Sequence, residues 1–297
     1  MDIEAWRQRV RDFAVDLAAE AQSEPTGGSQ VADAYADASR ALARLDAALA
    51  GQNRPTITPG TQLPPIEVAA PVLGVDGCRA GWVGAVLEPG APRPRVVVAP
   101  TIAELVAMVR ESLGIRVVGI DIPIGLPDKT IRQADQLARN ALPGKSSSIF
   151  STLTRAAYLA DSRLDADAVN RDLVGQGVGA QAFSLRDKIV EVDAWVRTRP
   201  TVTVLEVHPE LSFATMTGAP IKASKKTDEG RSQRLSALAE AGLARPSVLE
   251  GQGYAADDVL DACAVAWTAA RHAAGQARPL PDPPEVFSDG IPAAIWA

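Results

Sequence analysis

The sequence predicts an α/β domain built on a mixed five-stranded sheet with helices on both faces. Apolar runs separated by glycine-rich and proline-rich turns follow one another closely over residues 72–99, which is typical of an antiparallel meander of three strands. Two later apolar runs, at residues 115–125 and 201–210, each follow a stretch with helical periodicity. A meander followed by alternating helices and strands indicates an α/β fold, so we expect antiparallel pairing over the first three strands.

The first two strands are expected to form a hairpin over residues 72–86. An apolar run leads to Asp76, a glycine turn follows, and a second apolar run leads away, so we place Asp76 at the bend. The third strand covers residues 95–99. Thr101 is then expected to cap a helix whose apolar residues share one side, with Glu104 in the capping-box position.

The fourth and fifth predicted strands both end in an acid, Asp121 and Glu206 respectively. The segment between them, residues 129–199, is predicted to be mostly helical. A lysine-rich loop follows the fifth strand, and the last long helix is expected to begin near Ala255. We expect the proline-rich tail of residues 279–297 to be irregular, so the main domain is predicted to cover residues 72–278.

The residues before the main domain predict a separate unit. Residues 1–50 carry two helical stripes with a break between them, which indicates a helical hairpin. Residues 51–71 contain five prolines and no periodicity, as expected of a semi-extended linker. Because two helices bury little surface by themselves, the hairpin is expected to pack on the main body, form a homodimer or bind a protein partner.

Composition limits the classes of partner. The net charge of −6 excludes a global cationic field, so any binding of nucleic acid must be local. The two cysteines are too few for a disulfide framework and indicate a reducing compartment. We find neither a basic-apolar amino-terminal leader nor an apolar span of about 18 residues, so we expect a cytoplasmic protein that does not bind membranes.

Four elements deliver acids from apolar surroundings. The strands carry Asp76, Asp121 and Glu206, and the last helix carries Asp258 and Asp261, which are three apart and share one face. Converging carboxylates repel unless cations hold them, and hard oxygen ligands suit Mg²⁺ or Mn²⁺. Two such ions about 4 Å apart can support phosphodiester cleavage. We therefore predict that these five acids are catalytic and that the four aspartates bind the metal.

Several of these residues have a structural alternative. Asp76 could brace the turn after it, Asp121 could accept amides of the next loop, and Glu206 could pair with a lysine. His208 could transfer protons or bind metal, or it could only close a strand and cap a helix.

The acids of the last helix differ in their position. Asp257 and Asp258 lie near the helix start, where acids favourably meet the helix dipole. Asp261 lies one turn further into an apolar helix, which makes it the better metal ligand of the three.

Basic residues surround the acidic strands in loops and helices. They could form a solvated face, or a rim that contacts phosphates and so supplies local binding to nucleic acid. The candidate substrate-binding residues are Lys145, Arg155, Lys222, Lys225, Lys226 and Arg231.

Four motifs follow one another in order along the chain, at residues 74–82, 119–127, 206–210 and 257–262. Together they resemble the domain-of-unknown-function family 429, over residues 72–273. That resemblance implies a ribonuclease H-like fold akin to Holliday junction resolvases, with predicted nuclease activity. It also implies metal ligands at Asp76 on the first strand, at Asp121 on the fourth, and at Asp258 or Asp261 on the last helix.

We therefore predict a metal-dependent nuclease that hydrolyses phosphodiester bonds in nucleic acid, with Mg²⁺ or Mn²⁺ held by carboxylates. One alternative is an ATP-dependent phosphotransferase of the actin-like superfamily, which places an acidic glycine-turn hairpin against phosphates. That fold normally needs two such domains and an adenosine motif, which we do not find. The other alternative is a non-catalytic protein that uses the helical hairpin to bind a partner.

Overall fold

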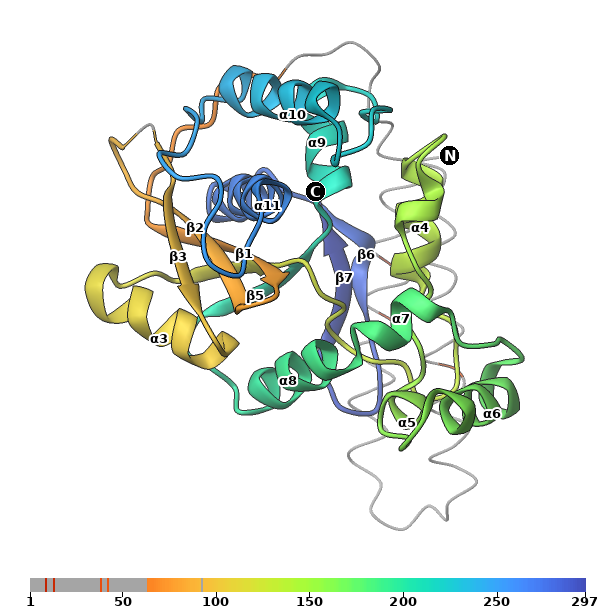
Figure 1. Ribbon diagram of the computed structural model, residues 1–297. Helices are drawn as coiled ribbons and strands as arrows, with labels where there is room; N and C mark the ends of the chain where they lie inside the picture. The colour runs from red at the N-terminus through yellow and green to blue at the C-terminus, as the bar shows by residue number, and fades with distance from the viewer. Residues whose placement is uncertain (1–8, 10–12, 14–37, 39–41, 43–62, 92) are drawn as a thin grey trace. The chain divides into compact units, whose positions relative to one another are not determined.

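The computed structural model describes residues 9, 13, 38, 42, 63–91 and 93–297 (Figure 1). The chain divides into two compact units, residues 1–56 and 57–297. Nearly all of the predicted hairpin of residues 1–50 and most of the predicted linker lie outside the described residues. Residues 63–71, at the end of that linker, form neither helix nor strand. The features below all belong to the second unit.

The second unit is built on a seven-stranded mixed sheet in the order β3-β2-β1-β4-β5-β7-β6. The first three strands pair antiparallel, and β4 and β5 run parallel to β1, which confirms the predicted α/β class and the predicted meander. The prediction of five strands was wrong. The strands are β1 (Val72–Cys78), β2 (Gly81–Leu87), β3 (Arg95–Ala99), β4 (Val117–Ile120), β5 (Thr203–Val207), β6 (Pro279–Val286) and β7 (Pro292–Trp296).

The two additional strands come from the tail that we predicted to be irregular. β7 pairs in parallel with β5, and β6 pairs antiparallel with β7 at the edge of the sheet. Proline cannot donate a hydrogen bond to a neighbouring strand, so within sheets it is confined mainly to edges and irregular positions. The prolines of β6 are tolerated because this strand has a partner on one side only, and its pairing with β7 is irregular between Leu280 and Glu285.

The hairpin of β1 and β2 is present, but Asp76 does not lie at its bend. Asp76 is opposite Val83 inside the ladder, and the turn is formed by residues 79 and 80 between the pair Cys78 and Gly81. The glycine after Asp76 suggested an earlier turn. Gly77 instead continues the strand, and Gly81, with φ of 118°, has the positive φ that favours glycine.

Helices cover both faces of the sheet (Figure 1). α9, α10 and α11 pack on one face, and α3 and α8 pack on the other. Thr101 caps α3 as predicted, by accepting a hydrogen bond from the Glu104 backbone N–H. The helices are α3 (Ile102–Leu113), α4 (Gln133–Ala141), the 3-10 turn η2 (Ser146–Ser148), α5 (Arg155–Tyr158), α6 (Arg163–Val174), α7 (Ala180–Ser184), α8 (Arg186–Arg197), α9 (Pro209–Thr217), α10 (Asp228–Glu240) and α11 (Ala256–Ala273).

The last long helix, α11, begins where predicted and packs directly on the backbone of β1. A Cβ atom at Gly74 would lie 2.1 Å from the Ala266 backbone nitrogen and 2.3 Å from the Ala262 carbonyl oxygen. Backbone atoms cannot give way as a flexible side chain can, so only glycine permits this approach. Within the described residues, no helix is long and apolar enough to cross a membrane.

The substitution Gly74→Ala is therefore expected to lower the free energy of unfolding by about 3 kcal/mol, because the added methyl group overlaps the α11 backbone. Chemical denaturation measures the effect. Gly179→Ala is the matched control, since a Cβ there meets nothing within 4 Å and φ is −64°. Equal stability of the two variants would contradict the close packing of β1 and α11.

Candidate metal centre

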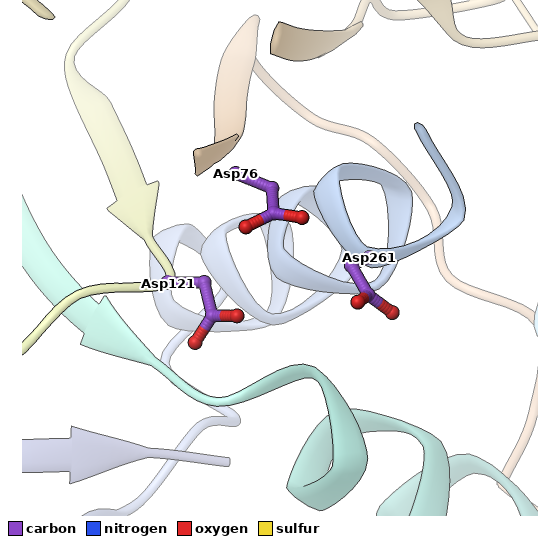
Figure 2. Close-up of side chains that lie close together, drawn as sticks. All are labelled: Asp76, Asp121 and Asp261. Carbon is purple, nitrogen blue, oxygen red and sulfur yellow. The ribbon is translucent and has the colours of Figure 1, made fainter. Parts of the chain in front are cut away.

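Three carboxylates meet at one end of the sheet. Asp76 comes from β1, Asp121 directly follows β4, and Asp261 comes from the second turn of α11. One ligand oxygen of each lies within 4.8 Å of the others, and Figure 2 shows the three side chains converging from their separate elements. Among the described residues, this is the one group of three or more acids, histidines and cysteines with such spacing. We call these three residues the aspartate triad.

Local structure fixes the position of each member of the triad. The Asp76 carboxylate accepts a hydrogen bond of 2.7 Å from the Gly77 backbone N–H. The Asp121 backbone N–H donates to the Val75 carbonyl oxygen at 2.9 Å, which ties the end of β4 to β1. Asp261 is only 3% exposed and is carried by the helix that contacts Gly74.

Burial and mutual repulsion make the triad carboxylates resist ionisation. Desolvation, followed by the charges of Asp121 and Asp261, raises the pKa of Asp76 well above its ordinary value. The pKa of Asp121 rises to about 8, because burial and then the charge of Asp261 disfavour its ionised form. Burial also raises the pKa of Asp261 to about 6, although Lys225 opposes the rise. A cation placed among the three would therefore gain substantial stabilisation.

The donor set fits a hard divalent cation. All three side chains offer carboxylate oxygens from rigid elements, and no sulfur or nitrogen ligand belongs to the group. Oxygen-only sites of this kind suit Mg²⁺ or Mn²⁺ better than softer metals. The triad could hold one such ion, with other positions left for water or substrate.

Glu206 lies apart from the triad in a separate ion-pair network. Its carboxylate accepts hydrogen bonds from Arg132 at 2.6 Å and from the Ile124 backbone N–H at 2.7 Å. Arg132 is fully buried, and it also contacts Asp135 and Thr152. The predicted alternative for Glu206 was a lysine partner, whereas its partner is this arginine. Burial raises the pKa of Glu206 to about 7 despite that pairing.

Asp257 and Asp258 lie in the first turn of α11 and, unlike Asp261, do not belong to the triad. Asp258 is half-buried and accepts a hydrogen bond of 2.9 Å from the Ala255 backbone N–H, as an acid at a helix start often does. It lines the same cavity as the triad but is not one of its three members. Asp257 neither lines this cavity nor belongs to the triad.

A cavity of about 230 Å³ opens onto Asp76 and Asp121. The loop after α4 contributes Ser148 and Phe150 to its wall, and the helical segment that contains α7 and α8 contributes Gln181 and Lys188. Side chains from the insert between β4 and β5 therefore stand beside the acids at the end of the sheet.

His208 also lines this cavity. It is the residue before α9, and its side chain makes no capping hydrogen bond. Its Nε2 atom lies 3.4 Å from the Ser148 carbonyl oxygen, and burial lowers the pKa of His208 to about 4. The imidazole is therefore neutral at physiological pH, and it is not a member of the triad.

The predicted substrate-binding cations occupy different surroundings. Lys225 alone among the six lines the cavity, and its Nζ atom lies 2.5 Å from Asp261 Oδ2. Arg155 pairs with Asp193 and Asp289, and Arg231 lies 3.9 Å from Glu250. Lys222 and Lys226 are exposed and Lys145 is half-buried, all three outside the cavity wall.

Sequence reasoning did not select two charged residues beside the site. Lys188 lines the cavity and lies over the Trp82 ring at 4.3 Å from its centroid, and Arg132 neutralises Glu206. Both residues lie in helical stretches that carry many other charged residues. The amino-acid pattern around them therefore does not distinguish them from charged residues on a solvent-exposed face. Their significance depends on contacts with residues far along the chain.

The raised carboxyl pKa values predict that the metal-free protein loses stability as pH rises from 6.5 to 8. Folded Asp121 keeps its proton up to about pH 8, whereas the unfolded side chain has released it, so the folded state binds more protons in this window. Asp121 alone contributes at most about 1.4 kcal/mol per pH unit. His208, with its pKa lowered to about 4, opposes this loss near pH 6.5, where the unfolded imidazole still binds protons, and its effect fades as pH rises toward 8.

Urea denaturation in the presence of a chelator, at several pH values, measures this dependence. Asp121→Asn is expected to have a flatter profile than the wild type, because the amide does not titrate. A wild-type profile that is flat or rises over this window would contradict the raised pKa values.

Comparison with known proteins identifies the family of the chain. The family model described as protein of unknown function (DUF429) matches residues 74–286, which confirms the resemblance carried by the four motifs. No curated protein and no solved structure matches the chain.

Proposed function

Since the chain belongs to the DUF429 family, whose description states no function, we propose from the site itself that the protein is a metal-dependent nuclease. The observation that carries this proposal is the aspartate triad, in which two buried carboxylates, from β1 and α11, and the half-buried carboxylate that follows β4 meet beside a cavity. Holding three acids together, two of them buried, is costly without cations to balance their charge. A cation site of this composition is suited to phosphoryl chemistry.

The arrangement of the sheet supports a ribonuclease H-like origin. The resemblance implies metal ligands on the first strand, the fourth strand and the last helix. Asp76 and Asp261 lie on β1 and α11, and Asp121 directly follows β4. Pairing of β1 with β4 brings the first two acids to neighbouring positions. The hairpin of β6 and β7 and the helices between β4 and β5 would be additions to that core.

In this proposal Asp76, Asp121 and Asp261 hold Mg²⁺ or Mn²⁺. The bound ion supplies Lewis-acid stabilisation of charge on the phosphate and favours activation of water. In the net hydrolysis, a water oxygen bonds to phosphorus, the bond from phosphorus to the leaving oxygen breaks, and one proton passes from the water to the leaving oxygen. Lys188 and Lys225, which line the cavity, would contact the phosphate.

The remaining predicted residues take supporting roles in the proposal. Glu206, neutralised by Arg132, would hold the loop after β4 through the Ile124 backbone, and Asp258 would face the substrate from the cavity wall.

Nucleic acid is the proposed partner and the cytoplasm the proposed location. A role for residues 1–50 in dimerisation or protein binding remains a prediction.

Cleavage of labelled single-stranded and double-stranded DNA, RNA and branched junctions, with Mg²⁺ or Mn²⁺, tests the proposal. Asp76→Asn is expected to reduce cleavage by at least about 100-fold, as loss of a charge-stabilising group does in other enzymes. The fold should persist, which circular dichroism can check, since the amide is nearly isosteric with the acid. Asp172→Asn, on the exposed face of α6, is the matched control and should cleave like the wild type.

The nuclease proposal fails if the wild type cleaves none of these substrates and neither ion raises its melting temperature. An increase in melting temperature with ATP instead would favour the phosphotransferase alternative. Cleavage that survives in Asp76→Asn would remove Asp76 from the catalytic group.

A further inference from the structure

The ammonium group of Lys225 pairs with one member of the aspartate triad, Asp261. Its Nζ atom donates to Asp261 Oδ2 at 2.5 Å, and the side chain is 37% exposed. Lys225 lines the cavity that also contacts Asp76 and Asp121. One positive charge of the protein is thus built into the centre that a metal ion would enter.

The loop that carries Lys225 is held firmly on the side of α10. Arg234 is fully buried, and its guanidinium donates to the carbonyl oxygens of Ala223 at 3.3 Å and Gly230 at 3.1 Å. The same guanidinium pairs with Glu210 at 2.6 Å. Through its two terminal nitrogens, this buried arginine fixes the backbone two residues before Lys225.

Hydrogen bonds at the first residues of α10 also fix the loop, on the carboxyl-terminal side of Lys225. The Thr227 hydroxyl donates to the Ser224 carbonyl oxygen at 2.8 Å and accepts from the Gly230 backbone N–H at 3.1 Å. A Cβ at Gly230 would lie 2.0 Å from that same carbonyl oxygen, so the loop packs tightly against the helix. Lys225 is therefore presented to the triad by an ordered backbone.

Charge balance limits the number of metal ions at this centre. The three carboxylates carry three negative charges when ionised, which one divalent cation and the Lys225 ammonium together neutralise. The other acids that line the cavity are already engaged, since Glu206 pairs with Arg132, Asp135 contacts Arg132, and Asp258 accepts from the Ala255 N–H. A second divalent ion would compete with Lys225 for Asp261.

We infer that this centre takes one divalent cation, and that the Lys225 ammonium supplies the second positive charge that a second metal ion would otherwise provide. This inference rests on the proposed nuclease function. In the hydrolysis described above, Lys225 would stabilise the negative charge that develops on the leaving oxygen as its bond to phosphorus breaks. The oxygen then gains the proton lost by the water.

Calorimetric titration of Mn²⁺ into the full-length protein tests the inference without relying on activity. The wild type is expected to bind one ion per chain. Lys225→Met is expected to bind the first ion at least about tenfold more tightly, because a repelling charge a few ångströms away is removed and Asp261 Oδ2 is released. Cleavage by the same variant should fall, so metal affinity and activity move in opposite directions.

Two further variants complete the experiment. Lys129→Met is the matched control, since Lys129 is exposed and does not line the cavity, and its Mn²⁺ affinity should equal that of the wild type. Lys225→Gln keeps a donor for Asp261 without the charge, and should also bind Mn²⁺ more tightly if Lys225→Met fails to fold.

Three results would overturn the inference. Two Mn²⁺ ions bound per wild-type chain, or neutral Lys225 variants with unchanged or weaker affinity, would reject it while leaving the nuclease proposal intact. Absence of Mn²⁺ and Mg²⁺ binding in the wild type and in every variant would reject both proposals together.

Discussion

Direct contact between α11 and the backbone of β1 at Gly74 determines the geometry on which the site depends. Gly74 and Asp76 are two residues apart on a strand, so they point to the same face, toward the helix. Ala262 and Ala266 meet Gly74, which fixes the helix along the strand and brings the neighbouring Asp261 toward Asp76. A larger residue at Gly74 would lift the helix and separate the two carboxylates. The packing of small residues thus sets the spacing of the charged ones.

Two groups of acids lie at the same end of the sheet. They differ in how much positive charge from the protein balances their carboxylates. In the first, Arg132 pairs with Glu206 and Asp135 and also bonds Thr152, so the acids there have a protein cation and hydrogen-bond donors. In the second, the aspartate triad has Lys225 as its ion-pair partner. Burial raises the pKa of acids in both groups, but three clustered carboxylates that share one lysine have less positive charge per acid and can accept a further cation. The first group therefore suits a structural role, and the second suits binding.

The triad residues could be predicted because each acid stands out within its own apolar strand or helix. The role of Glu206 could not be predicted in this way. Asp121 and Glu206 look alike in sequence, since each ends an apolar strand. What separates them is Arg132, which is 74 residues from Glu206 and becomes its neighbour only in the folded chain. The strands of residues 279–297 were missed for a similar reason. Their prolines predict irregular structure locally, and only pairing at the sheet edge makes β6 possible.

One of the helices inserted between β4 and β5, α8, is anchored to β2 and α3, so it forms a fixed part of the cavity wall. Glu191 of α8 accepts hydrogen bonds from the Trp82 indole at 3.0 Å and from the first backbone N–H of α3, at Ile102, at 2.7 Å. One turn earlier on α8, Lys188 lies against Gly77, directly after Asp76. Lys188 therefore places a cationic side chain in the cavity wall beside Asp76. This arrangement favours an anionic group entering beside β1.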